Sequence, residues 1–466
     1  MSDTSTFRLG AGTGYWGDML EPSLELLEHG DLDAMGFDLL AELTVSALSR
    51  ARMRDPQRGH IPDTKAIFEQ ALPPARRNGV TLVANAGGAN PRAALRAVAQ
   101  AAETIGDLDL MIGVVEGDDI LGDLEAIRSQ GWAFQNLDTG EADIDAIADR
   151  VVAANAYIGC DGVIDALAGG ADVVIGGRLA DSALYSGPLL HHFGLTPWTC
   201  SDELRGAALT VGHLLECGGA CSGGMSSQWE VSTDPWRLGY PFADVTQSGE
   251  AMISKLPGSG GIVNQWTIKE QMLYEVHDPR DYRLPDGVVD LAGVTVTEQG
   301  ADRVAVSGMT AAAPPKLLKV QIGYEDGYIA EGRVIQPWPD AARKVAWSEE
   351  FLTRRLEHLG VDVREIRFDH VGVNALAGSA AAESDLADAN EIELRVAVRT
   401  HTRREAEMAR RTIVHLATAG PVGTAIGPPP PVRKVVALWP TLVPRECVKI
   451  DVDVVAAGTE VGRARA

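Results

Sequence analysis

The stretch VTLVANAGGANPRAALRAVAQAAETIGDLDLMIGVVEGDD, residues 80–119, decides the fold. The apolar run from Val80 to Ala86 predicts a strand, the alanine-rich segment from Arg92 to Ile105 predicts a helix, and Leu108 to Val115 predicts a second strand. Two strands joined by a helix of this length form a right-handed parallel unit. The stretch therefore predicts a parallel sheet whose strands are followed by polar and glycine residues.

The alternation of strand and helix continues on both sides of this stretch. Further strands are predicted over residues 6–10, 37–44, 132–137, 151–157 and 171–177. From about Asp290 the pattern changes to shorter strands, a hairpin expected around Glu325-Asp326-Gly327, and two helices. We therefore predict an α/β fold, a mostly parallel sheet with flanking helices, over residues 1–289, and a smaller α+β domain over residues 290–466.

The composition is that of an acidic globular protein. The chain has 466 residues, 45% of them hydrophobic, and a formal net charge of −24, which argues against a nucleic-acid partner because the phosphates would be repelled. No apolar run reaches the roughly 18 residues that a membrane helix needs, and residues 1–8 lack the pattern of a signal peptide. The five scattered cysteines form no CxxC pair. We expect a cytoplasmic protein that binds neither nucleic acid nor membranes.

Polar residues follow the predicted strands, and in a parallel sheet the ligand crevice lies outside the carboxyl ends of the strands. Arg178 is the expected anchor for an anionic group, because its planar fork matches a carboxylate or phosphate and it caps no helix start. The alternative is a structural ion pair with Asp181. For the aspartates and asparagines, capping of the next helix is an equally simple explanation. The residues predicted to bind substrate are Arg178, Asn85, Asn90, Asp118, Asp119, Asn155, Tyr157 and the loop glycines Gly12, Gly14 and Gly260.

The stretch from Gly212 to Gly224 carries the residues expected to do chemistry. On a helix, His213 and Glu216 lie at i and i+3 and Cys217 at i+4, so a base, an acid and a thiol share one face. The catalytic prediction is His213 and Glu216 together with Asp181, which can transfer protons. The alternative is a buried helix end whose polar groups serve only the structure.

No metal site is predicted, although a divalent ion stays an open possibility. The carboxylates of Asp118, Asp119 and Asp181 with His213 offer suitable donor types, but no HxxxH or comparable spacing supports a site.

Taken in order, these motifs resemble those of the acyclic terpene utilisation AtuA family, also described as DUF1446-type proteins. The resemblance is carried by Gly10-Ala11-Gly12 with Gly17-Asp18, Asn85 with Ala89-Asn90-Pro91, Val115-Glu116-Gly117-Asp118-Asp119, Asn155-Ala156-Tyr157, Gly177-Arg178-Leu179-Ala180-Asp181, Gly212 to Gly218 and Pro257 to Gly261. It implies a role in the breakdown of citronellol- and geraniol-type acids as CoA thioesters, so CoA is expected as part of the substrate. Longer relatives carry a further ferredoxin-like domain, which we expect to be absent here or supplied by another polypeptide.

The function predicted from residues and resemblance together is a lyase or hydratase/dehydratase acting on a branched acyl-CoA-type thioester or a related carboxylic acid. Two alternatives stay open. One is a hydrolase that uses Cys217 or Ser182 as nucleophile, although no GxSxG elbow is present. The other is a non-catalytic subunit that needs a partner domain.

Assembly is the first testable expectation. Small residues and a 45% hydrophobic composition provide interface material, so we expect a homodimer or a larger symmetric assembly. Light scattering at micromolar concentration checks this, and a strict monomer would contradict it.

Overall fold

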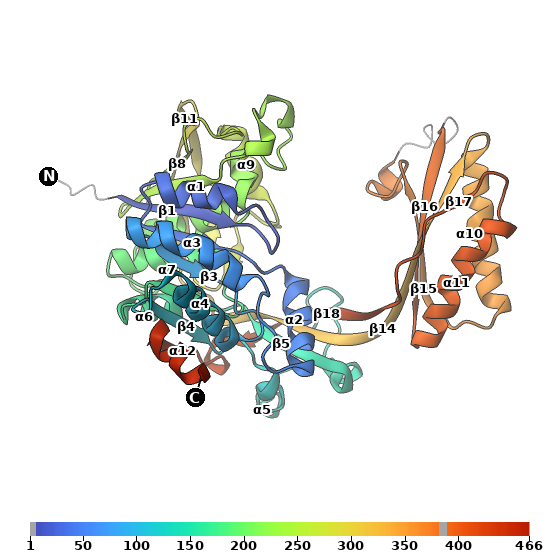
Figure 1. Ribbon diagram of the computed structural model, residues 1–466, viewed down its shortest axis with the longest axis horizontal. Helices are drawn as coiled ribbons and strands as arrows, with labels where there is room; N and C mark the ends of the chain where they lie inside the picture. Colours follow the sequence, from blue (N-terminus) through green and yellow to red (C-terminus); the bar gives the residue numbers. More distant parts are fainter. Residues whose placement is uncertain (1–5, 382–388, 466) are drawn as a thin grey trace. The chain divides into compact units, whose positions relative to one another are not determined.

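The computed structural model describes residues 6–381 and 389–465, which form two compact units (Figure 1). Unit 1 runs to Gly323 and resumes at Leu438, whereas unit 2 is Tyr324–Ala437. The predicted boundary at residues 289 and 290 thus falls inside unit 1. Residues 290–323 join unit 1 because their strands complete its sheets, and the same holds for the returning C-terminal segment. Each unit is described by itself.

The centre of unit 1 is a set of parallel strands, as expected for the α/β class, which is confirmed. Their order across the sheet is β1 (Thr6–Thr13), β2 (Ala34–Phe37), β3 (Thr81–Ala84), β6 (Val173–Gly176) and β4 (Met111–Glu116). The strands are short and almost entirely buried, which explains their near-continuous apolar sequence.

Antiparallel strands extend this parallel centre at both edges. On the β1 side the strands follow outward in the order β7 (Pro241–Thr246), β8 (Ala251–Lys255), β12 (Arg303–Ser307) and β11 (Thr295–Gly300). On the other side β19 (Asp451–Ala456) pairs with β4. A separate three-stranded sheet consists of β9 (Tyr282–Leu284), β10 (Gly287–Asp290) and β13 (Thr310–Ala312). The complete large sheet is therefore mixed.

Helices cover the sheet in two groups (Figure 1). In the first, α3 packs between α1 and α4, and α4 also packs against α12. In the second, α7 packs between α6 and α8. The bounds are α1 (Glu21–His29), α3 (Thr64–Asn78), α4 (Pro91–Ile105), α6 (Asp161–Ala168), α7 (Ala183–His192), α8 (Asp202–Leu215) and α12 (Ala457–Arg465). Within the described residues, no helix is both long enough and apolar enough to cross a membrane.

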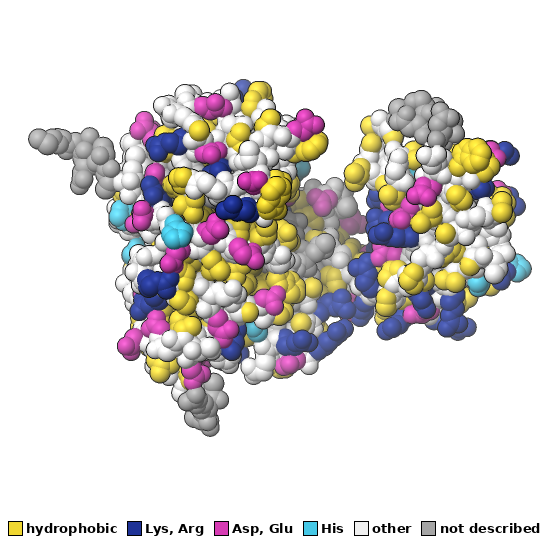
Figure 2. Space-filling view, turned by 45° about the horizontal axis from the view of Figure 1, so that its top comes forward, with side chains coloured by type: hydrophobic (Ala, Val, Ile, Leu, Met, Phe, Trp, Pro, Cys, Tyr) yellow, Lys and Arg dark blue, Asp and Glu magenta, His cyan; other side chains and the backbone are white. Residues whose placement is uncertain are grey.

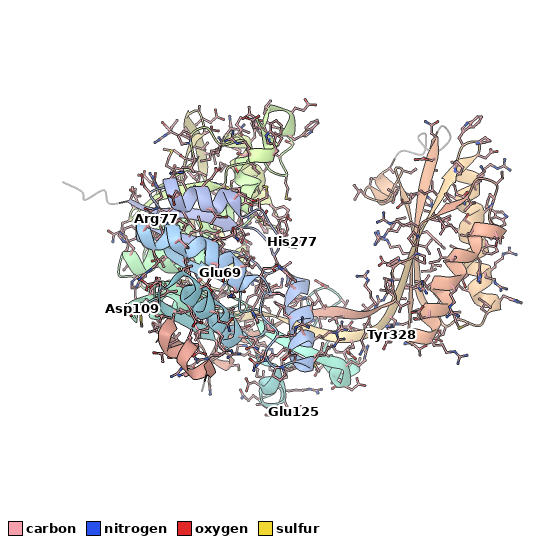
Figure 3. The ribbon with its side chains drawn as sticks, in the orientation of Figure 1. Glu69, Arg77, Asp109, Glu125, His277 and Tyr328 are labelled. Carbon is pink, nitrogen blue, oxygen red and sulfur yellow. The ribbon has the colours of Figure 1, made fainter. Side chains whose placement is uncertain are left out.

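Unit 2 is a sheet with two helices on one face. Its strands are β14 (Leu317–Pro337), β15 (Val363–Val371), β16 (Glu391–Thr400), β17 (Ala425–Ile426) and β18 (Arg433–Pro444), and its helices are α10 (Ala341–His358) and α11 (Arg403–Ala419). The helices bury a core with the sheet that includes Leu352, Val396 and Ile413. Tyr328 marks the part of β14 that belongs to this unit (Figure 3).

The hairpin predicted around Glu325-Asp326-Gly327 is wrong. The chain passes through these residues within the single strand β14. The buried carboxylate of Asp326 is paired with Arg364 at 2.5 Å and with Arg399 from the neighbouring strands β15 and β16. Gly327 supplies a positive φ of 79° inside the strand instead of at a turn.

Gly12 tests how closely β1 and β2 pack. A Cβ atom at Gly12 would lie 2.4 Å from the carbonyl oxygen of Gly36 on β2, a clash that only a backbone shift can relieve. Gly12→Ala should therefore lower the free energy of unfolding by about 1–3 kcal/mol, measured by urea denaturation. Gly122→Ala is the matched control, because a Cβ there meets no atom within 4 Å. Equal stability of both variants would contradict the packing argument.

Candidate active site

Buried polar side chains gather in unit 1 where the parallel strands end. Asp38 follows β2, Asn85 follows β3, Asp118 follows β4 and Arg178 follows β6, and all four are nearly inaccessible to solvent. The carboxyl edge of a parallel sheet is where α/β folds bind ligands. These residues therefore frame the candidate site.

Arg178 is the cation of this group, and only 3% of its surface is exposed. One guanidinium nitrogen donates to Asp181 Oδ1 at 2.7 Å and to the carbonyl of Leu179 at 3.0 Å, while the guanidinium stacks 4.2 Å from the ring centre of Tyr157. Burial opposes the charge, but the carboxylate of Asp181 favours it, and the pKa of Arg178 is raised. Its buried Nε has no hydrogen-bond partner among the described residues. This N–H is free to bind an acceptor of a ligand.

Asp118 holds the loop that carries Arg178. Its Oδ2 accepts hydrogen bonds from the backbone N–H of Arg178 and from Asn155 Nδ2, each at 2.9 Å. Burial raises the pKa of Asp118 to about 6, although both hydrogen bonds oppose the shift.

Asp38 and Asn85 form a second buried pair. Asn85 donates from Nδ2 to Asp38 Oδ1 at 2.7 Å and accepts from the backbone N–H of Leu39 at 2.7 Å. Burial raises the pKa of Asp38, the charge of Asp181 adds to this, and Arg178 counteracts it. The sequence prediction missed Asp38 because it extended the strand over residues 37–44, whereas β2 ends at Phe37.

His213 and Glu216 project from the end of α8 and contact each other in the interior. His213 Nδ1 lies 2.9 Å from Glu216 Oε1 and 3.3 Å from the phenolic oxygen of Tyr282, and His213 is 1% exposed. Its other nitrogen, Nε2, is buried and has no partner in the described part of the chain. The imidazole is thus oriented through Nδ1, and Nε2 is left for a proton transfer.

Proton affinity in this pair is set by burial and by mutual attraction. Burial lowers the pKa of His213, but the charge and hydrogen bond of Glu216, together with smaller contributions from Glu275 and the backbone of Met272, outweigh it and raise the pKa overall. Burial also raises the pKa of Glu216 to about 7, against the effect of His213. Each residue therefore shifts the titration of the other, and the titration belongs to both residues together.

The arginine group and the histidine group belong to one region. The carboxylates of Asp181 and Glu216 both act on the buried phenols of Tyr185 and Tyr282 and raise the pKa of each. Tyr185 also donates to the carbonyls of Gly36 and Leu215, at 3.2 and 3.1 Å, and so links β2 to the end of α8. The arginine group and the histidine group therefore lie near each other in unit 1.

The glycine-rich turn after β1 packs against the same region. A Cβ atom at Gly14 would lie 2.8 Å from the backbone of Cys217, so only glycine permits this approach. The turn is closed by a hydrogen bond of 2.8 Å from the N–H of Gly14 to Asp18 Oδ2. Gly14 thus lets the turn after β1 pack against the backbone of Cys217, the residue that follows Glu216.

A small cavity of about 10 Å³ opens beside Arg178. Its walls are Val45, Ser46, Asn155, Tyr157, Arg178 and Gln321. Two atoms of these residues, Arg178 Nε and Gln321 Oε1, are buried without a partner among the residues described. A cavity of this size holds one water or one small polar group, and this one offers both a donor and an acceptor.

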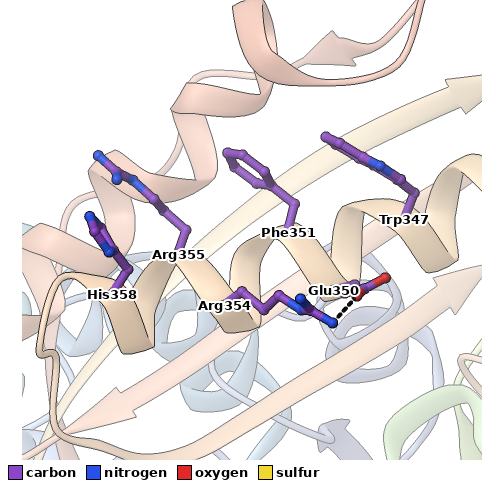
Figure 4. Close-up of a pocket in the computed structure, with 6 residues that line it drawn as sticks. All are labelled: Trp347, Glu350, Phe351, Arg354, Arg355 and His358. Atoms are coloured by element: carbon purple, nitrogen blue, oxygen red, sulfur yellow. Dashed lines mark ion pairs between the residues drawn. The ribbon is translucent and has the colours of Figure 1, made fainter.

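A larger open hollow of about 380 Å³ lies along α10 in unit 2 and is lined by that helix alone (Figure 4). The rings of Trp347 and Phe351 stack at 5.4 Å, and Arg354 pairs with Glu350 at 2.6 Å. Trp347, Glu350 and Arg354 are solvent-exposed and Phe351 is partly buried against the core of unit 2, unlike the fully buried groups of unit 1. The candidate active site is therefore the one at the sheet edge.

Comparison with known families agrees with the motifs at these strand ends. The family model for the acyclic terpene utilisation family protein AtuA matches residues 7–454. The chain belongs to the AtuA family. No curated protein and no solved structure matches the chain.

Four residues predicted to bind substrate lie outside the cluster in this AtuA-family chain. Asn90 caps α4 and donates to the carbonyls of residues 56 and 58, and Asp119 is half-exposed and pairs with Arg52 at 3.4 Å. Gly12 packs against β2, and Gly260 packs against the backbone of residues 234–237. Besides Asp38, the structure adds Tyr282 and Gln321, which sequence spacing gave no means to connect with the site.

The described residues contain no group of three or more His, Cys, Asp or Glu side chains placed to hold a metal ion. Asp118 and His213, two of the residues considered for such a site, instead have protein partners at hydrogen-bond distance.

Asp118 should make the stability of the AtuA-family fold depend on pH. Its folded pKa of about 6 exceeds the value of roughly 3.9 in an unfolded chain. The folded state therefore binds more protons between these values, and stability from this group is lost as pH rises through 6. In the wild type this group should lower the free energy of unfolding by about 2 kcal/mol between pH 4 and pH 7, and Asp118→Asn should abolish that decrease. Urea denaturation at both pH values measures it. The control is Asp149→Asn at an exposed position, and an unchanged pH dependence in Asp118→Asn would contradict the assignment.

Proposed function

We propose that this AtuA-family protein is a lyase, of the hydratase/dehydratase or carbon–carbon lyase type, acting on a branched acyl-CoA-type thioester or a related carboxylic acid. The family match supports a role in acyclic terpene utilisation. The observation that carries the proposal is the buried His213–Glu216 pair, whose Nε2 is unpartnered among the described residues, in one cluster with Arg178.

Addition or removal of water next to a thioester needs a base for the proton beside the carbonyl and an acid for the departing hydroxyl. With Glu216 ionised, Nδ1 of His213 carries the proton and Nε2 presents a lone pair, which makes His213 the base. The resulting imidazolium can return the proton to the hydroxyl. Asp181, whose side chain is 31% exposed, is the member that connects the cluster with solvent.

The developing enolate needs donors that are already in place. Arg178 supplies a buried cation and a free Nε–H, and its position is fixed by Asp118, Asp181 and the ring of Tyr157. A preorganised donor in a buried site stabilises charge more strongly than one in water.

The hydrolase alternative has less support from the geometry. Burial raises the pKa of the Cys217 thiol, so little of the nucleophilic thiolate exists at neutral pH. Ser182 Oγ is buried and makes no hydrogen bond within the described residues, so no base activates it.

The roles in the dyad can be tested by substitution. His213→Ala and Glu216→Gln should each lower turnover by on the order of a hundredfold or more, the usual effect of losing a general acid or base. Cys217→Ser should keep most activity. The assay follows the enoyl thioester absorbance during hydration of a branched enoyl-CoA, or its formation from the 3-hydroxyacyl-CoA.

Circular dichroism and melting temperature confirm folding of each variant. Full activity in both dyad variants would overturn the proposed roles. Loss of activity in Cys217→Ser alone would favour the hydrolase.

A further inference from the structure

A cluster of arginines stands out in a chain with an excess of acidic residues. The segment SRARMRDPQRGH, residues 49–60, holds Arg50, Arg52, Arg54 and Arg58, although the whole chain has 41 Lys and Arg against 65 Asp and Glu. The first three lie on helix α2 (Glu42–Arg54), and Arg58 lies in the loop that follows. Both signs of charge are spread over the molecular surface (Figure 2), so a local concentration of cations needs an explanation.

Most of this positive charge is not used inside the protein. Arg52 donates to the carbonyl of Ala89 at 2.5 Å and pairs with Asp119 at 3.4 Å. The side chains of Arg50, Arg54 and Arg58 make no ion pair or hydrogen bond with any described residue, and Arg54 and Arg58 are exposed. Arg76, Arg92 and Arg205 of unit 1 are paired with carboxylates. What sets Arg50, Arg54 and Arg58 apart is that three arginines unpaired within the described chain lie within nine residues of one another.

The same helix reaches the candidate active site. Val45 and Ser46 on α2 line the small cavity together with Arg178. Ser46, Arg50 and Arg54 follow one another at four-residue spacing, so they lie on neighbouring positions of one helix side. At a rise of 1.5 Å per residue, Arg54 lies about 12 Å along the helix from Ser46. One side of α2 thus leads from the cavity to the arginines.

Interaction with the helix dipole explains only part of this cluster. Cations in the last turn of a helix are favourable, which accounts for Arg52 and Arg54. It accounts neither for Arg50, which precedes the last turn, nor for Arg58, which lies beyond the helix end. Unpaired guanidinium groups are well suited to phosphate, which they bind through two parallel hydrogen bonds. In a protein of net charge −24, such a local group also offsets the repulsion that an anionic ligand meets.

We propose that Arg50, Arg54 and Arg58 bind the phosphate groups of a coenzyme A thioester whose carbonyl group lies in the small cavity beside Arg178. The long flexible arm between the nucleotide and the thioester group of such a molecule spans the separation along α2. This inference rests on the proposed function and makes it more specific, because it selects the nucleotide-bearing thioester over the free acid as substrate.

The experiment measures binding of coenzyme A by isothermal titration calorimetry. The test variant is the triple substitution Arg50→Gln, Arg54→Gln and Arg58→Gln. The matched control is Arg237→Gln, Arg280→Gln and Arg303→Gln, which removes the same charge from exposed arginines that form no ion pair within the described chain. The test variant should weaken binding at least tenfold, and the control should stay within about twofold of the wild type. The single change Arg58→Gln, outside any helix, should weaken binding severalfold without altering the melting temperature.

Three results would overturn the proposal. They are wild-type affinity in the test variant, an equal loss in the control, and inorganic phosphate binding as tightly as coenzyme A, which would indicate a general anion site. The outcome is separable from that of the proposed function. Arginine-dependent binding of coenzyme A without turnover would retain the subsite and reject the lyase. Turnover of free acids by the test variant at the wild-type rate would retain the lyase and reject the arginine subsite.

Discussion

A guanidinium group taken out of water is the constraint on which the candidate site depends. Burying Arg178 is costly unless carboxylates and hydrogen bonds compensate, and the ends of the parallel strands supply them. Asp181 pairs with the side chain, Asp118 fixes the backbone, and Tyr157 covers the planar face. Since β4 and β6 are neighbours, Asp118 and Arg178 meet across two strands whose register is set by the apolar core. Packing therefore determines where the charges lie.

The same burial gives the site its proton chemistry. Carboxyl groups that are shielded from water hold protons to higher pH, as in Asp38, Asp118 and Glu216. Of these, only Glu216 has an imidazole beside it, so there a proton can move between a carboxyl group and a nitrogen base in direct contact. A cation at one end of the cluster and a proton-exchanging pair at the other suit a substrate whose carbonyl is polarised while a neighbouring proton moves.

Local sequence pattern was enough for four of the five central strands and for most of the polar residues that follow them. It failed for β2, which ends where the strand predicted over residues 37–44 begins. The segment 132–137 forms no strand, and the strand predicted over residues 151–157 pairs with β14 instead of joining the parallel sheet. Each of the correctly predicted strands lies within one strand–helix–strand unit, as in residues 80–119. Features that depend on distant partners could not be predicted. The pairing of β19 with β4 joins segments far apart in the chain, and Tyr282 approaches His213 from a hairpin that shows no catalytic motif. Asp326 shows the same limit, because an Asp-Gly pair normally signals a turn, whereas here Asp326 lies within a strand and pairs with arginines of two neighbouring strands.

The return of the chain to unit 1 has a consequence for the order in which the protein is made. Strand β4 offers its outer edge to β19, which is synthesised only after the whole of unit 2 has been completed. Until then a nascent chain carries an unpaired, apolar strand edge, the kind of surface that recruits other strands. The core residues of unit 2 all lie within Tyr324–Ala437, so unit 2 can fold during this interval. The sheet that holds the candidate site is therefore among the last parts of the molecule to be closed during translation.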